Sequence, residues 1–385
     1  MPPALPPPPL GPPPIISAPP PPPRGRGNAV WKAIALIFIT LFILSFSAHF
    51  LGVSRSLSRG VIAGGRMTTD RSRALEEVIL QRTNSDNKIA IIEVEGVISS
   101  GCSDRSEMNL VDYINEQLKA AEHDSDVKAV ILKVDSPGGE VLASDEINHL
   151  LVKFQDHSRK PVIASMQGMA ASGGYYISAP CRWIVANELT LTGSIGVIMH
   201  GCNYRHLMDK IGIRPHVFKS GQYKDMFSGE SEPDEDLLSP EDKKVRVEED
   251  RMMQTLIDET FNKFKEVVKN GRERAARENN GHGKSLANDW QNYADGRVFS
   301  GKEALQRGFV DELGDLDTAV QRAQNLANVS SANLVAYRLP FDLGSVLSHI
   351  FGKAGTPALK VDLGVDLPRL QAGRPYFIAP MTVLH

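Results

Sequence analysis

The sequence predicts an α/β fold, in which short buried strands alternate with amphipathic helices. Apolar runs of strand length occupy residues 127–135 and 161–166, and residues 141–154 between them have apolar positions at helical spacing. Strands that alternate with helices pair in one sheet through right-handed crossovers. Functional sites in such folds collect at the carboxyl ends of the strands, so the turns that follow the strands are the first places to search.

The region before the folded domain divides into three predicted segments. Residues 1–28 are rich in proline, which favours polyproline II and cannot build a core; we expect a solvated tail, and a ligand for a proline-binding partner is the alternative. Residues 29–53 contain an uncharged apolar run and reach the roughly 20 residues that a bilayer requires, so we expect a transmembrane signal anchor. A cleaved signal peptide is the alternative, which the long proline tail disfavours. Residues 54–87 are expected to be a polar linker with a short helix at 73–81.

The folded domain is expected over residues 88–327. Its first half alternates strands and helices, with predicted elements at 88–98, 109–122, 127–135, 141–154, 161–166, 175–179 and 183–186. Its second half has a short helix, a strand, a loop and a long helix, predicted at 204–211, 215–218, 220–229 and 240–270. Residues 328–385 form a predicted C-terminal tail, whose apolar runs at 346–351 and 374–378 are expected to dock on the domain or on a neighbour.

Ser172 lies in a stretch of small residues between a predicted buried strand and a predicted helix. Gly168, Gly173 and Gly174 permit a tight turn and a close approach of substrate. A hydroxyl at a helix N-terminus faces unpaired amides and the positive end of the helix dipole, which stabilise negative charge that develops nearby. Ser172 is therefore a candidate nucleophile. A helix start packed on a strand is the alternative that this stretch alone leaves open.

A nucleophilic serine needs an oxyanion hole and a base. Two glycines follow the strand at 127–135, and their bare amides suit an oxyanion hole. A serine hydroxyl becomes nucleophilic when a base takes its proton, and the histidines of this chain lie in no recognisable catalytic motif. A lysine can also serve as the base where burial leaves its amine neutral.

Four motifs, in this order along the chain, resemble the signal peptide peptidase A family. They are Ser-Pro-Gly-Gly at 136–139, Ala-Ala-Ser-Gly-Gly-Tyr-Tyr at 170–176, Thr-Gly-Ser-Ile-Gly-Val at 192–197 and Ser-Gly-Gln-Tyr-Lys-Asp at 220–225. The resemblance covers about residues 89–327. The family consists of membrane-anchored Ser/Lys-dyad serine proteases with a fold similar to the Clp protease and crotonase superfamily. The resemblance therefore implies repeated β-β-α units preceded by one transmembrane helix.

The same resemblance implies a role for each matching residue. Ser172 matches the nucleophile, Lys224 the general base and Ser194 the hydroxyl that orients the lysine, whereas the Gly139 and Gly173 amides match the oxyanion hole. The implied substrates are remnant signal peptides or other short hydrophobic peptides. The family further implies a ring-shaped homo-oligomer, in which different subunits can supply the serine and the lysine. It also implies a catalytic domain on the outer side of the cell membrane, an orientation that the balanced basic residues around 29–53 leave undecided.

Composition and cysteine spacing restrict the other function classes. The net charge of −3 offers no electrostatic reason for binding nucleic acid. Cys102, Cys181 and Cys202 have no zinc-ligand spacing; we expect unpaired thiols and no metal or cofactor, and a single disulfide in an extracytoplasmic compartment is the alternative. Two alternative functions stay open: a crotonase-type acyl-CoA enzyme and a non-catalytic membrane scaffold. The predicted anchor and Lys224 count against the first, and the intact motif residues count against the second.

Overall fold

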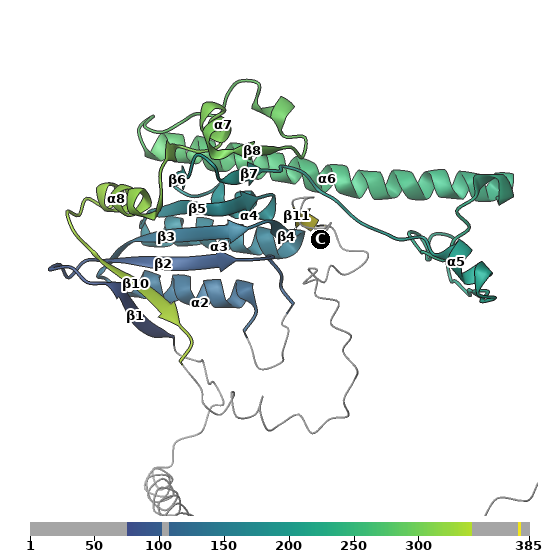
Figure 1. Cartoon of the computed structure of the whole chain (residues 1–385), viewed down its shortest axis with the longest axis horizontal. Coiled ribbons are helices and arrows are strands. Elements are labelled where there is room, and N and C mark those ends of the chain that lie inside the picture. Colours follow the sequence, from purple (N-terminus) through teal and green to yellow (C-terminus); the bar gives the residue numbers. More distant parts are fainter. Residues whose placement is uncertain (1–74, 102–107, 341–375, 379–385) are drawn as a thin grey trace, which may run out of the picture. The chain divides into compact units, whose positions relative to one another are not determined.

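A twisted sheet of nine strands forms the centre of the structure, a computed structural model that describes residues 75–101, 108–340 and 376–378 (Figure 1). The main path of this sheet has the order β1-β10-β2-β3-β5-β6-β9, while β7 pairs with β5, and β8 with β7. The strands are β1 (Glu76–Gln81), β2 (Lys88–Glu95), β3 (Val127–Ser136), β5 (Val162–Ala171), β6 (Trp183–Ala186), β7 (Leu191–Gly193), β8 (Val298–Ser300), β9 (Glu312–Leu313) and β10 (Asn333–Arg338). Within this sheet of described strands, only the β1–β10 and β7–β8 pairs are antiparallel.

Helices cover both faces of this sheet, as the alternation along the strands requires. Ala90 and Ile92 of β2 belong to a core shared with α2 (Leu110–His123), α3 (Val141–Ser158) and α4 (Gly173–Ser178). Ile89 and Ile91, the residues between and before them, belong to a second core with α8 (Leu316–Leu326). The remaining helices are α5 (Arg205–Lys210), α6 (Pro240–Glu278) and α7 (Gly301–Gln306). The predicted α/β class is confirmed.

Two predicted elements are wrong. The helix expected at 73–81 is instead strand β1, because its Val78 and Ile79 suit a pleated strand and the open edge of β10 supplies backbone partners. The strand expected at 215–218 is not formed; Val217 and Phe218 are exposed, and no strand among the described residues pairs with them. The sheet also takes β1 from the range expected as linker and β10 from the range expected as tail.

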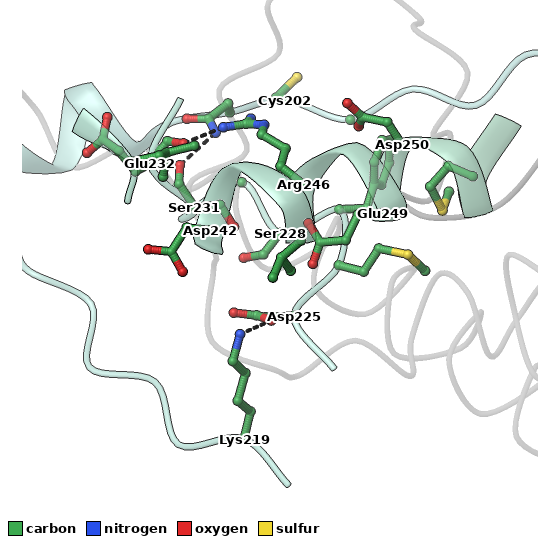
Figure 2. Close-up of a pocket in the computed structure, with 18 residues that line it drawn as sticks. Cys202, Lys219, Asp225, Ser228, Ser231, Glu232, Asp242, Arg246, Glu249 and Asp250 are labelled. Atoms are coloured by element: carbon green, nitrogen blue, oxygen red, sulfur yellow. Dashed lines mark hydrogen bonds and ion pairs between the residues drawn. The ribbon is translucent and has the colours of Figure 1, made fainter. Parts of the chain in front are cut away.

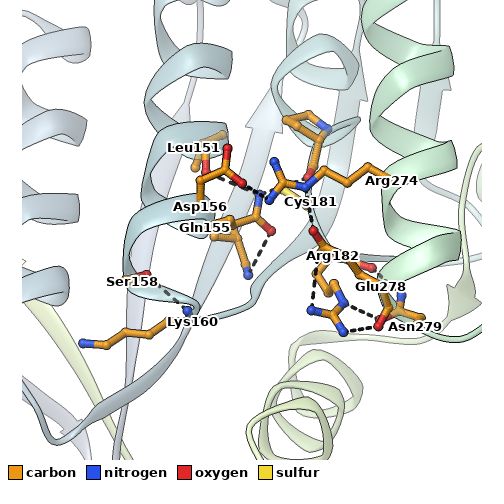
Figure 3. Close-up of polar contacts among 12 residues, drawn as sticks. Leu151, Gln155, Asp156, Ser158, Lys160, Cys181, Arg182, Arg274, Glu278 and Asn279 are labelled. Carbon is orange, nitrogen blue, oxygen red and sulfur yellow. Dashed lines mark hydrogen bonds and ion pairs between the residues drawn. The ribbon is translucent and has the colours of Figure 1, made fainter.

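Helix α6 is anchored at its C-terminal end and leaves the sheet at the other (Figure 1). Its buried residues are Phe264, Val268, Gly271, Arg272 and Ala275. Figure 3 shows polar contacts at this end: Arg182 binds Asn279 and Glu278, while Arg274 bridges Glu278 and Asp156 of α3 at 2.8 and 2.7 Å. By contrast, no described residue from 199 to 263 is buried. We call residues 199–263 the arm.

The predicted transmembrane anchor at 29–53 lies outside the described residues. Within the described ranges, no helix combines the length and the apolar composition that crossing a membrane requires.

Candidate active site

Ser172 occupies the turn between β5 and α4, where the backbone is strained. Its φ of 53° and ψ of −114° lie outside the regions that a residue with a Cβ usually adopts. The turn is held by the Ser172 amide, which donates to the Gly193 carbonyl at 2.8 Å. The residue is 1% exposed, yet its Oγ has no hydrogen-bond partner among the described residues. Such strain persists where the surrounding structure enforces it, and it is concentrated at functional sites.

Gly139 and Gly173, the two predicted oxyanion-hole residues, lie side by side. Gly139 is the middle residue of β4 (Gly138–Glu140), which follows directly from the end of β3. A Cβ placed on Gly173 would lie 3.1 Å from the Gly139 nitrogen and 2.7 Å from Ser144 Oγ. A Cβ placed on Gly139 would lie 1.9 Å from the Ile98 carbonyl oxygen. Both positions therefore need glycine for space, and this close packing brings the two backbones together.

Ser194 lies beside Ser172 because the strands that precede them are neighbours. Strands β5 and β7 are parallel, and Ala171 pairs with Gly193, so each serine is the next residue after a paired position. Ser194 has a φ of 49°, is 3% exposed, and donates its amide to the Arg297 carbonyl at 2.7 Å. The structure thus brings together four of the five predicted site residues.

Lys224 is the exception. It lies on the arm with an exposed side chain, and its backbone amide donates to the Gly221 carbonyl at 3.2 Å. Because Ser172 Oγ has no partner, the structure does not bring Lys224 to the serine within one chain. A cavity of ≈410 Å³ on the arm also lies apart from the predicted site: its lining includes Lys219 and Asp225, paired at 2.7 Å, but neither Lys224 nor Ser172 (Figure 2).

One contact of this site was not predicted. Strand β11 (Tyr376–Ile378) pairs with β4, so a distant part of the chain lies against Gly139. The apolar run at 374–378 predicted that this part would dock, but nothing in the sequence indicated β4 as its partner.

The two described cysteines are unpaired. Cys181 and Cys202 are free thiols, and burial raises the pKa of Cys181 to about 12, so its sulfur stays protonated near neutral pH. In the part of the chain that the structure describes, no three His, Cys, Asp or Glu side chains are grouped as metal ligands.

Comparison with known proteins shows which family this chain belongs to. The sequence signature of "Peptidase family S49" matches residues 154–330. The chain is 33% identical to the "Putative signal peptide peptidase SppA" of Enterococcus faecium, over 69% of this chain and 72% of the relative. The chain belongs to peptidase family S49. It is also 36% identical to a putative protease of Synechocystis, over 64% of this chain and 77% of that protein.

The S49 chain has longer relatives as well. "Protease 4" of Haemophilus influenzae is 36% identical over 65% of this chain but only 36% of its own length. A solved membrane-bound stomatin-specific protease with a substrate peptide is 17% identical to this chain, with a TM-score of 0.36. The match covers 69% of this chain and 97% of that one. The family and its named proteases make this S49 chain a serine protease.

Proposed function

We propose that this S49 protease is a membrane-anchored endopeptidase that cleaves remnant signal peptides or other short hydrophobic peptides. In this proposal Ser172 is the nucleophile and Lys224 the general base. The observation that carries the proposal is the Ser172 turn: a buried, unpartnered hydroxyl on a strained backbone, next to the paired glycines 139 and 173. The name of the Enterococcus faecium relative supports the substrate class.

The chemistry follows from these groups. Neutral Lys224 takes the proton of Ser172 as Oγ attacks the peptide carbonyl, whose oxygen becomes an oxyanion. The amides of Gly139 and Gly173 donate to that oxygen, each worth on the order of 3 kcal/mol if typical. The lysine then gives the proton to the leaving amine, which breaks the C–N bond and leaves an acyl-enzyme. Water, deprotonated by the same lysine, releases the acyl group and restores Ser172. Ser194 orients the lysine.

In our proposal the lysine comes from a second copy of the chain in a ring-shaped homo-oligomer. The exposed position of Lys224 on the arm supports this, since no contact joins this lysine to Ser172 in its own chain. The arm also exposes large apolar side chains that a neighbour can cover, among them Phe218 at 87% and Leu207 at 61% exposure. A head-to-tail ring repeats one such contact around the assembly.

Co-expressed variants test both the dyad and its division between copies. Ser172→Ala and Lys224→Ala, made in the full chain, should each abolish cleavage of a hydrophobic signal-like peptide. Together in one assembly they should restore about a quarter of wild-type activity, because random mixing in a ring puts an intact serine beside an intact lysine at that fraction of sites. Cleavage by either single variant would refute the assigned roles. No recovery in mixed assemblies that size-exclusion chromatography shows to form would refute the shared dyad.

The anchor belongs to the proposal too. Residues 29–53 would hold the protease at the cell membrane with the catalytic domain on the outer side, where remnant signal peptides are released. Alkaline carbonate extraction of membranes tests this: the full chain should stay with the membrane, and removal of residues 29–53 should release it.

A further inference from the structure

The Lys219 side chain closes the turn that presents Lys224. Its Nζ donates to the Gln222 carbonyl at 3.1 Å and to Asp225 Oδ1 at 2.7 Å. One of these acceptors lies shortly before Lys224 in the chain, and the other directly follows it. The bond to Asp225 joins two charges and is shorter than the 3.2 Å backbone bond from the Lys224 amide to the Gly221 carbonyl. Since charge-assisted bonds are the stronger kind, the Lys219 side chain is the main tie across this turn.

The Asp225 carboxylate matters for the chemistry because it directly follows Lys224 in the chain. In the proposed mechanism the lysine must be a neutral amine to take the Ser172 proton. A nearby carboxylate favours the charged ammonium form instead, and a nearby cation opposes that effect. Among the described residues, Lys219 is the one cation within ion-pair distance of Asp225. Its charge therefore offsets the hindrance that this carboxylate would impose on the base.

We propose that Lys219 is a positioning residue, which holds the turn that presents Lys224 and pairs the carboxylate beside that lysine. The inference rests on the proposed function, which assigns proton transfer to Lys224. Lys219 itself transfers no proton and binds no peptide in this proposal, because it acts only through Lys224. One lysine of the loop thus keeps the other in place and in its neutral form.

The remaining charges near this ion pair line the cavity on the arm (Figure 2). Besides Lys219, the titratable side chains that line it together with Asp225 are Cys202, Glu232, Asp242, Arg246, Glu249 and Asp250. Burial raises the pKa of Glu249, and the Asp225 carboxylate raises it further. Lys219 and Arg246 oppose this rise in the pKa of Glu249. Because all these side chains except Lys219 and Asp225 are unchanged in the variants that test the proposal, a difference between the variants reports on that pair.

The pH dependence of cleavage tests the electrostatic part of this role. The kcat for the hydrophobic signal-like peptide would be measured with the full chain between about pH 6 and pH 10. Lys219→Met should move the pH of half-maximal kcat about half a unit toward alkaline pH, because it removes one cation and frees one carboxylate beside the base. Asp225→Asn should move this midpoint in the opposite direction, and the double variant should return it close to the wild-type value. A loss of folded or assembled protein would lower kcat without moving the midpoint.

Lys219→Arg and Lys210→Met provide the matched controls. The first keeps the positive charge, and the second removes an exposed lysine from α5, elsewhere on the arm. Both should keep the wild-type midpoint, and KM should stay the same in all these variants because none of them removes a peptide-binding group. An equal midpoint for Lys219→Met and Lys210→Met would overturn the proposal.

Hydrogen–deuterium exchange reports on the turn without any need for turnover. It would be measured in the full chain carrying Ser172→Ala. Lys219→Met should speed the exchange of the Lys224 and Met226 amides, which donate within this turn, about three-fold, whereas the two controls should not. If Lys224→Ala still cleaves peptide, the proposed base fails, and the exchange alone decides whether Lys219 holds the turn. If cleavage requires Lys224 while Lys219→Met leaves both the midpoint and the exchange unchanged, the chemistry stands and the positioning role is refuted.

Discussion

At the scale of single residues, the site needs glycine at positions where the surrounding atoms leave no room for a side chain. Gly139→Ala would place a Cβ 1.9 Å from the Ile98 carbonyl oxygen, a backbone atom that cannot move away without disturbing strand β4. We expect this variant to lose about 1–3 kcal/mol of unfolding free energy, the usual cost of overpacking. The matched control is Gly168→Ala, whose Cβ would meet nothing closer than an Asp135 oxygen at 3.5 Å and should shift stability by less than about 0.5 kcal/mol. Urea denaturation of both variants checks this, and equal midpoints would contradict it.

Turn chemistry explains why most of the site could be predicted from the sequence. Ser172, Gly173 and Gly139 lie within a few residues of a strand end, so small residues after an apolar run mark them as candidates, and the resemblance to the family supplies their roles. Gly139 and Ser172 lie close together because β3 and β5 are neighbours in the sheet. The predicted α/β class is consistent with this strand order but does not specify it. Lys224 had no such local signal. Its loop is exposed, and no contact within the described residues joins Lys224 to Ser172.

At the scale of elements, a buried charged pair holds the C-terminal end of helix α6 against the rest of the fold. The Arg272 guanidinium is bound to Asp311, with both side chains 2% exposed, and donates to the Cys181 carbonyl at 3.1 Å. Asp311 also accepts the amides of Ile184 and Lys284, at 2.8 and 3.1 Å. One carboxylate thus joins α6, strand β6 and the loop after α6. The amphipathic pattern predicted that a long helix begins at Pro240, but not this buried pair, because a single charge in a sequence carries no sign of its partner.

Removal of the Asp311 carboxylate should loosen the C-terminal end of α6 from the sheet. Asp311→Ala leaves the Arg272 charge buried and unpaired, which typically costs about 3–5 kcal/mol. Glu248→Ala provides a control on the same helix, since its 3.4 Å contact with Arg251 is exposed and such pairs contribute at most about 1 kcal/mol. Thermal unfolding followed by circular dichroism should therefore show a large fall in Tm for Asp311→Ala alone. A similar Tm for both variants would mean that the buried pair does not hold the helix.

At the scale of the whole molecule, the described residues divide into a packed body and an exposed arm. Both cores lie within the body, whereas residues 199–263 contain no buried side chain among those described. The arm nevertheless carries apolar side chains that a solvated segment does not need, including Leu207, Ile211 and Phe218 at 61%, 62% and 87% exposure. The strand predicted at 215–218 does not form for the same reason. Val217 and Phe218 are apolar, but they lie on the arm, where no described strand pairs with them.

A substitution on the arm therefore tests whether the chain assembles through this segment. If neighbouring copies cover the arm, Phe218→Asp should place a charge in that interface and shift the protein toward monomers in analytical ultracentrifugation. Peptide cleavage should fall in proportion to the lost assembly, because each serine then lacks the lysine of its neighbour. Leu189→Asp is the matched control, since Leu189 is 78% exposed but lies on the body between β6 and β7. It should leave assembly and cleavage unchanged. Full activity of a monomeric Phe218→Asp protein would show that one chain completes its own site, and that Lys224 must swing onto Ser172 from the arm of the same copy.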